Sequence, residues 1–178
     1  MNAETRFLII LPTYNEKENL RTLVPALLDQ YPETNILIID DNSPDKTGIL
    51  ADKLVSFYPS KVFVLHRPEK QGLGTAYKAG FKFAFEQDYD YIITMDSDWS
   101  HHPQAISLFI KEIKNTDLVV GSRYIQHGKI KNWSFLRLLL SKAGNYYIRL
   151  ITKLPIKDIH QDFNVLKRLR LKQLSPWI

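Results

Sequence analysis

Five short apolar runs without polar alternation recur along the first two thirds of the chain. They cover residues 7–11, 36–39, 62–65, 91–95 and 118–120. Such a run is typical of a strand that is covered on both faces, as in a parallel sheet. Segments with helical spacing lie between the runs, at residues 16–30, 46–57, 74–86 and 104–113. Strand and helix in regular succession predict an α/β sandwich with a mainly parallel central sheet.

Polar segments follow four of these runs directly. They are residues 12–16, 40–45, 66–74 and 96–98. In wound parallel sheets, ligands bind beyond the carboxyl ends of the strands. We therefore expect the four segments to meet at one edge of the sheet and to form the active site there.

The pair Asp96 and Asp98 is the first candidate for chemistry, because it comes directly after the fourth run. Alternate residues can face the same way, so both carboxylates can reach one hard cation such as Mg²⁺ or Mn²⁺. A cation there would bridge a diphosphate and stabilise the charge that develops as it leaves. The alternative is capping of the helix that begins near Pro103. The clustered acids after the second run favour the metal site.

Three acids follow the second run, and they have different predicted roles. Asp41 is predicted to accept hydrogen bonds from a base or a ribose. For Asp40 and Asp45 the favoured interpretation is structural, because the segment can start the next helix by side-chain capping.

The pair Gly72 and Gly74 superficially suggests a dinucleotide fingerprint. The fingerprint needs a third glycine at position 77, where the chain has Tyr77, and it belongs after the first strand. These departures argue against a nicotinamide cofactor. A helix start preceded by Lys70 either faces a phosphate or is an ordinary helix start.

Length and composition set further limits. The chain has 178 residues, is 44% hydrophobic and has no cysteine, so we expect one domain over 1–178 without disulfides or a thiolate site. The polar N-terminus predicts no signal peptide, and no apolar stretch is long enough to span a membrane. The expected location is cytoplasmic, free or bound to a membrane surface.

The net charge of +5 divides unevenly along the chain. Residues 1–120 have 12 basic and 17 acidic side chains, whereas residues 121–178 have 12 basic and 2 acidic ones. In residues 129–157 the cations alternate with aromatic and aliphatic residues, which fits an amphipathic segment in a membrane interface. The alternative is an ordinary helix packed on the sheet. No nucleic-acid-binding motif accompanies the charge, so we expect no nucleic-acid partner.

The motifs occur in a recognisable order. They are Pro12-Thr-Tyr-Asn-Glu16, Asp40-Asp-Asn-Ser-Pro-Asp45, Lys70-Gln-Gly-Leu-Gly74, Asp96-Ser-Asp98 with Ser100-His-His-Pro103, and Gly121-Ser-Arg-Tyr124. Together they resemble the inverting glycosyltransferases of family two, specifically the dolichol-phosphate (polyprenol-phosphate) mannose synthases. The resemblance implies a GT-A fold and transfer of mannose from GDP-mannose to a polyprenyl phosphate. It also implies a divalent cation, Mg²⁺ or Mn²⁺, and peripheral attachment at the cytoplasmic face of a membrane.

The resemblance also implies roles for individual residues. Those expected to bind the nucleotide sugar are Pro12, Tyr14, Glu16, Asp41, Lys70, Asp96, Ser97 and Asp98. Those expected to hold the metal are Asp96, Asp98 and Ser100. Those expected to cradle the acceptor phosphate are Arg123, Arg137 and Ser141. Asp98 and Arg123 are the residues expected to be catalytic. Because the acceptor is already ionised, positioning and neutralisation of the leaving diphosphate should outweigh general-base catalysis.

Two features depart from the family. Relatives have a Thr/Ser- and Gly-rich turn where this chain reads Asp158-Ile-His-Gln-Asp-Phe163, and they continue beyond the position of Ile178. The early end suggests a shortened version or a partner chain that supplies the missing elements. Two alternatives therefore stay open. One is a transferase of the same family that uses another sugar nucleotide, such as UDP-glucose; the other is a weakly active relative that binds nucleotide or membrane.

Overall fold

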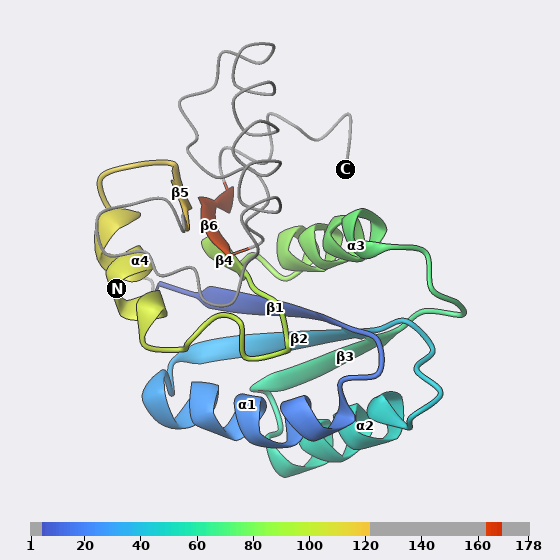
Figure 1. Ribbon diagram of the computed structural model, residues 1–178. Helices are drawn as coiled ribbons and strands as arrows, with labels where there is room; N and C mark the ends of the chain where they lie inside the picture. The colour runs from blue at the N-terminus through green and yellow to red at the C-terminus, as the bar shows by residue number, and fades with distance from the viewer. Residues whose placement is uncertain (1–4, 122–162, 169–178) are drawn as a thin grey trace, which may run out of the picture. The chain divides into compact units, whose positions relative to one another are not determined.

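The computed structural model describes residues 5–121 and 163–168 (Figure 1). Their strands form one sheet in the order β3-β2-β1-β4-β6-β5. The strands are β1 (Phe7–Thr13), β2 (Thr34–Asp40), β3 (Val62–His66), β4 (Tyr91–Thr94), β5 (Leu118–Val120) and β6 (Asn164–Lys167). The helices are α1 (Lys17–Gln30), α2 (Thr47–Phe57), α3 (Leu73–Glu86) and α4 (Ala105–Glu112). The predicted alternation of strands and helices is confirmed, with element ends one or two residues from those expected.

Four strands pair in parallel, as the unbroken apolar runs predict. β1 lies between β2 and β4, and β2 also pairs with β3. The exception is β6, which pairs antiparallel with β4. The sequence did not indicate β6, because this four-residue strand has no continuous apolar run.

The sheet is covered on both faces, which is the physical reason for the unbroken runs. Ile9 and Leu11 of β1 belong to the core cluster on the side of α1 and α2. Leu8 and Ile10, the alternate residues of the same strand, belong to the cluster beneath α3. All four are fully buried. In the part of the chain that the structure describes, no helix is long and apolar enough to cross a bilayer.

By packing, the chain divides into two compact units. Residues 1–119 and 163–178 form one unit, and residues 120–162 form the other. The strands β1 to β4 and the four helices belong to the first unit. The expectation of one domain over 1–178 stays a prediction.

A close approach of α3 to the sheet explains Gly80. A Cβ atom at this position would lie 2.8 Å from two side-chain carbons of Ile10 and 3.1 Å from one of Ile39. We expect Gly80→Ala to lower the free energy of unfolding by about 1–3 kcal/mol, since the extra methyl overpacks the core. Urea unfolding followed by circular dichroism measures the change.

Gly74→Ala is the matched control, because Gly74 lies in the same helix with no atom within 4 Å of its would-be Cβ. This substitution should be neutral or stabilising by up to about 1 kcal/mol. Equal effects of the two substitutions would show that helix packing on the sheet does not restrict Gly80.

Candidate active site

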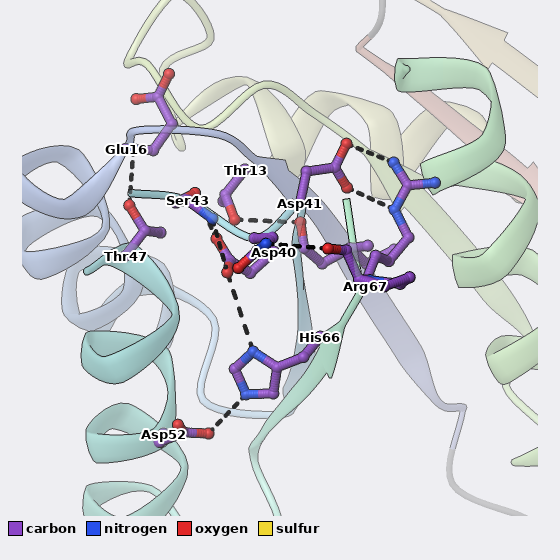
Figure 2. A network of polar contacts seen from close by, with 12 residues as sticks. Thr13, Glu16, Asp40, Asp41, Ser43, Thr47, Asp52, His66 and Arg67 are labelled. Atoms are coloured by element: carbon purple, nitrogen blue, oxygen red, sulfur yellow. Dashed lines mark hydrogen bonds and ion pairs between the residues drawn. The ribbon is translucent and has the colours of Figure 1, made fainter. Parts of the chain in front are cut away.

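Backbone and side-chain hydrogen bonds join the loops that follow β1 and β2. The backbone N–H of Asp41 donates to the carbonyl of Thr13 (3.1 Å), and that of Glu16 donates to Thr47 Oγ1 (3.0 Å). Figure 2 shows both loops meeting beside the end of β3. The starts of α1 and α2 are thereby held next to each other.

The loops after β3 and β4 join the same edge of the sheet. The Asn42 amide donates to the carbonyl of Pro68 (3.0 Å). The Ser97 hydroxyl donates to the carbonyl of Pro12 (3.1 Å). The predicted meeting of four polar loops at one sheet edge is therefore confirmed.

The segment from Asp96 to Asp98 has the alternation that a shared ligand site requires. Ser97 is buried and its hydroxyl is occupied by Pro12, whereas Asp98 is exposed and the Asp96 side chain is 33% exposed. The two carboxylates thus belong to the accessible positions on either side of a buried one. Asp98 also accepts a hydrogen bond from the backbone N–H of Ser100 (2.9 Å), which shapes the turn after it.

The donor set of this turn fits a hard cation that keeps other ligands. Asp96 and Asp98 offer carboxylate oxygens, which Mg²⁺ and Mn²⁺ prefer. Among the described residues, no group of three or more His, Cys, Asp or Glu side chains could hold a metal ion. Two carboxylates are enough for Mg²⁺ in nucleotide sites, where water and substrate phosphates complete the coordination.

The aromatic side chains of His101 and Phe163 support the turn that contains Asp96 and Asp98. The backbone N–H of Asp96 donates to Nδ1 of His101 (3.3 Å), so His101 holds the backbone of this turn by a hydrogen bond. The His101 ring stacks on Phe163 with 4.9 Å between ring centroids, and Phe163 also packs against Phe109 (4.4 Å). Phe163 is 4% exposed. In the sequence Phe163 stands out only as the end of an altered segment, because its packing partners His101 and Phe109 are more than 50 positions earlier.

The largest difference from expectation concerns Asp41, whose partner is Arg67. Arg67 Nε and one terminal nitrogen donate to the two carboxylate oxygens of Asp41, each at 2.5 Å. Both side chains are more than 90% buried. A carboxylate oxygen can accept more than one hydrogen bond, so this pairing leaves Asp41 acceptor capacity for a nucleoside.

Arg67 also joins β3 to the start of α3. Its guanidinium donates to Thr75 Oγ1 (2.6 Å) and to the carbonyl of Gly72 (3.1 Å). Gly72 has φ +92°, which favours glycine at this helix start. The sequence signal for Arg67 was a single cation directly after a strand, and we missed it because its partner is 26 positions earlier.

Asp40 has the structural role that the sequence predicts. It accepts hydrogen bonds from the Ser43 hydroxyl (2.5 Å) and the Ser43 backbone N–H (3.3 Å). His66 lies between this carboxylate and Asp52 of α2: Nδ1 is 4.0 Å from Asp40, and Nε2 is 2.9 Å from Asp52 (Figure 2). The network ties the end of β2 to α2.

Asp45 also has the predicted structural role, at the start of α2. It accepts hydrogen bonds from the Thr47 hydroxyl (2.5 Å), the Thr47 N–H (2.9 Å) and the Lys17 N–H (3.2 Å). Burial raises the pKa of the Asp45 carboxyl, but these hydrogen bonds and the charge of Lys17 outweigh it. The pKa of Asp45 therefore lies below its usual value of 3.8.

The lowered pKa predicts a pH-dependent contribution to stability. The ionised form of Asp45 is favoured in the folded state, so its contribution is complete above about pH 4 and is lost as the pH falls through the folded-state pKa. Asp45→Asn should lower the free energy of unfolding by about 1 kcal/mol at pH 7. The difference in the free energy of unfolding between Asp45→Asn and the parent protein should shrink as the pH falls below about 4. Urea titrations over this range measure the effect, with Asp29→Asn on the exposed end of α1 as control; a pH-independent difference would contradict it.

The remaining predicted nucleotide residues surround the β1 loop. Lys70 Nζ lies 3.8 Å from the ring centroid of Tyr14, a cation–π contact, and Tyr14 is 37% exposed. The Glu16 carboxylate accepts a hydrogen bond from the amide of Asn19 (2.6 Å). Tyr14 thus offers an accessible ring with a cation beside it, and it directly follows Thr13, whose carbonyl accepts a hydrogen bond from the backbone N–H of Asp41.

Part of the predicted site lies outside the described residues. This applies to Arg123, Arg137 and Ser141, to the basic segment 129–157 and to residues 158–162. Their predicted roles stay predictions.

Comparison with known proteins identifies the family. The family described as Glycosyl transferase family 2 matches residues 8–174. The chain belongs to this family. It is 41% identical over 171 residues to the polyprenol monophosphomannose synthase of Mycolicibacterium smegmatis and 41% identical over 170 residues to the undecaprenyl-phosphate mannosyltransferase of Micrococcus luteus. Each alignment covers 96% of this chain, which spans 64% and 70% of the lengths of these family 2 relatives.

Solved structures confirm the predicted GT-A type of α/β fold for this family 2 chain. A mannosyltransferase from Pyrobaculum calidifontis, solved with GDP-Man and Mn²⁺, matches 98% of this chain and 48% of its own with a TM-score of 0.66 at 16% identity. Glucosyl-3-phosphoglycerate synthase from Mycobacterium tuberculosis, solved with Mn²⁺, UDP-glucose and phosphoglyceric acid, matches 94% of this chain and 58% of its own with a TM-score of 0.67 at 15% identity. At these identities the likeness concerns the fold alone.

Proposed function

We propose that this protein transfers mannose from GDP-mannose to a polyprenyl phosphate. The observation that carries the proposal is the 41% identity, over 96% of the chain, to two proteins named for mannosyl transfer to polyprenyl or undecaprenyl phosphate. The meeting of the four polar loops supports it, because Tyr14, Asp41 and the two accessible aspartates lie on segments that share one edge of the sheet.

The nucleoside and the diphosphate of the donor each have fitting groups in the described residues. The ring of Tyr14 and the carboxylate of Asp41 suit the nucleoside, as a stacking surface and a hydrogen-bond acceptor. Asp96 and Asp98 suit a divalent cation, Mg²⁺ or Mn²⁺. When bound, such a cation supplies positive charge that stabilises the departing diphosphate.

The transfer needs little proton chemistry from the protein. An oxygen of the acceptor phosphate forms a bond to C1 of mannose, and the bond from C1 to the diphosphate oxygen breaks, giving GDP and polyprenyl phosphomannose with inversion at C1. The acceptor oxygen is already ionised, so the protein mainly has to position it. Arg123, Arg137 and Ser141 are the residues we propose for binding the acceptor phosphate, at the cytoplasmic face of a membrane.

Incubation of the purified protein with labelled GDP-mannose, Mn²⁺ or Mg²⁺ and a short polyprenyl phosphate dispersed in detergent tests the proposal. We expect lipid-linked mannose that requires the divalent cation. Parallel reactions with UDP-glucose separate the two donors, and product from UDP-glucose alone would replace mannose by another sugar. No product with any donor would overturn the enzymatic assignment.

A further inference from the structure

A groove between α1 and α2 lies outside the site described above. It has a volume of about 700 Å³. Lys17, Arg21 and Pro25 of α1 line one side, at intervals of one helical turn. The two helices that line it, α1 and α2, cover the same face of the sheet (Figure 1).

The charge of this groove is opposite to that of the surrounding sequence. Lys46, which directly precedes α2, and Lys53 of α2 line it together with the two cations of α1. None of its lining residues, all of them in the described part of the chain, has a carboxylate. Residues 1–120 as a whole have five more acidic than basic side chains. Four cations therefore gather on one face of an acidic segment.

These cations are largely available to a ligand. Arg21 pairs only at 3.7 Å with exposed Glu18, and the charge of Lys17 acts on the carboxylate of Asp45. Among the described ion pairs, none involves Lys46 or Lys53.

The same groove exposes large apolar side chains. Phe57 is 76% exposed and Ile49 is 56% exposed, and both line the groove. Leu54 and Tyr58 also line the groove; Leu54 belongs to the core, and Tyr58 packs against the core. A helix surface facing only water does not need an aromatic and a branched aliphatic residue next to cations, whereas an anionic lipid interface is contacted by this combination.

We propose that the α1–α2 groove docks the protein on an anionic phospholipid bilayer. The headgroup phosphates contact the four cations, and Phe57 and Ile49 enter the boundary between headgroups and acyl chains. The choice of a lipid surface over an acidic protein rests on the proposed function, because the acceptor is a membrane lipid. This contact is distinct from the basic segment 129–157, and it places α1 and α2 against the membrane.

The absence of cysteine from the chain allows a site-specific test. Ile49→Cys places one thiol in the groove, and Lys82→Cys places one on the exposed face of α3, on the opposite side of the sheet. Each variant of the full chain is labelled with an environment-sensitive fluorophore and mixed with vesicles of phosphatidylglycerol and phosphatidylcholine. We expect a blue shift at position 49 and none at position 82, and no shift with phosphatidylcholine alone. Vesicle binding without a shift at position 49 would overturn the proposal.

Charge and apolar variants give the second readout, co-sedimentation with the same vesicles at physiological salt. Arg21→Gln with Lys53→Gln should raise the lipid concentration needed for half binding about 25-fold, since each cation near an anionic surface contributes about fivefold. Phe57→Ser should raise it about fivefold. The matched control, Lys78→Gln with Lys82→Gln on α3, removes the same charge beyond the screening length and should change it less than about twofold. If both double variants raised the lipid concentration for half binding by the same factor, only the net charge of the protein would matter, and the proposal would be contradicted.

If the α1–α2 groove binds a second copy of the chain or another protein and not a lipid surface, the measurements have different outcomes. A dimer in sedimentation velocity that Phe57→Ser dissociates would assign the groove to a second copy of the chain. Saturable binding of a synthetic acidic amphipathic helix, with unchanged vesicle binding in the groove variants, would assign it to a protein. Either result overturns the lipid assignment. Vesicle binding is measured without donor, and mannosyl transfer is measured with a detergent-dispersed acceptor, so failure of the docking surface is distinguishable from failure of the proposed function.

Discussion

Replacing Arg67 with alanine is expected to lower the free energy of unfolding by about 3–5 kcal/mol. The substitution leaves the Asp41 carboxylate buried without the guanidinium that donates two hydrogen bonds to it at 2.5 Å. It also removes the link to Thr75 and Gly72 at the start of α3. Urea unfolding measures the loss.

Three further variants separate the buried pair from a general loss of arginine. Arg67→Lys should be intermediate, because an ammonium cannot present two parallel donors. Arg67→Ala combined with Asp41→Asn should recover part of the loss, because no buried charge stays unpaired. Arg21→Ala removes an exposed pair and should change stability by less than about 1 kcal/mol. If Arg67→Ala cost no more than Arg21→Ala, the buried pair would not stabilise the fold.

The same variants bear on donor binding. Arg67 holds Asp41 in one orientation at the end of β2, so its loss should weaken GDP-mannose binding in addition to stability. Isothermal titration calorimetry on Arg67→Lys, which should stay folded, measures this effect. Unchanged affinity would limit the role of Arg67 to folding.

Replacing Asp98 with alanine is expected to lower kcat/KM for mannosyl transfer by about 100- to 1,000-fold. Asp98 is the more accessible of the two carboxylates in the turn after β4, and its loss leaves Asp96 as the one carboxylate for the cation. The reaction should also need a higher concentration of Mn²⁺ for half-maximal rate. Steady-state kinetics at several Mn²⁺ concentrations measure both changes.

Asp29→Ala is the matched control for Asp98→Ala. It removes another exposed carboxylate, near the end of α1 and away from the loops that follow the strands, and should leave kcat/KM unchanged. Calorimetry with GDP-mannose gives a readout that does not require turnover: the increase in affinity caused by Mn²⁺ should disappear in Asp98→Ala alone. If Mn²⁺ still increased the affinity of Asp98→Ala for GDP-mannose, Asp98 would not be a ligand of the metal ion.

The order of strands and helices, and the edge where polar loops gather, could be derived from the sequence. Strands buried on both faces need apolar residues at every position, so the runs at residues 7–11 and 36–39 indicate parallel pairing before any contact is known. Asp45 could be predicted in the same way, because its partner Thr47 is two positions away and helix capping is local. For Asp96 and Asp98, the position after a buried strand indicated accessible carboxylates at the ligand edge.

Only the tertiary structure decided contacts between residues that are far apart in the chain. Asp41 and Arg67 meet because β2 and β3 pair in a register that brings both strand ends to the same place. Phe163 reaches His101 because β6 inserts beside β4, and Gly80 has no room for a side chain because α3 approaches Ile10. Local patterns record burial and capping, since these depend on neighbouring residues. Which cation pairs with which buried acid depends on strand register, which a single sequence does not display.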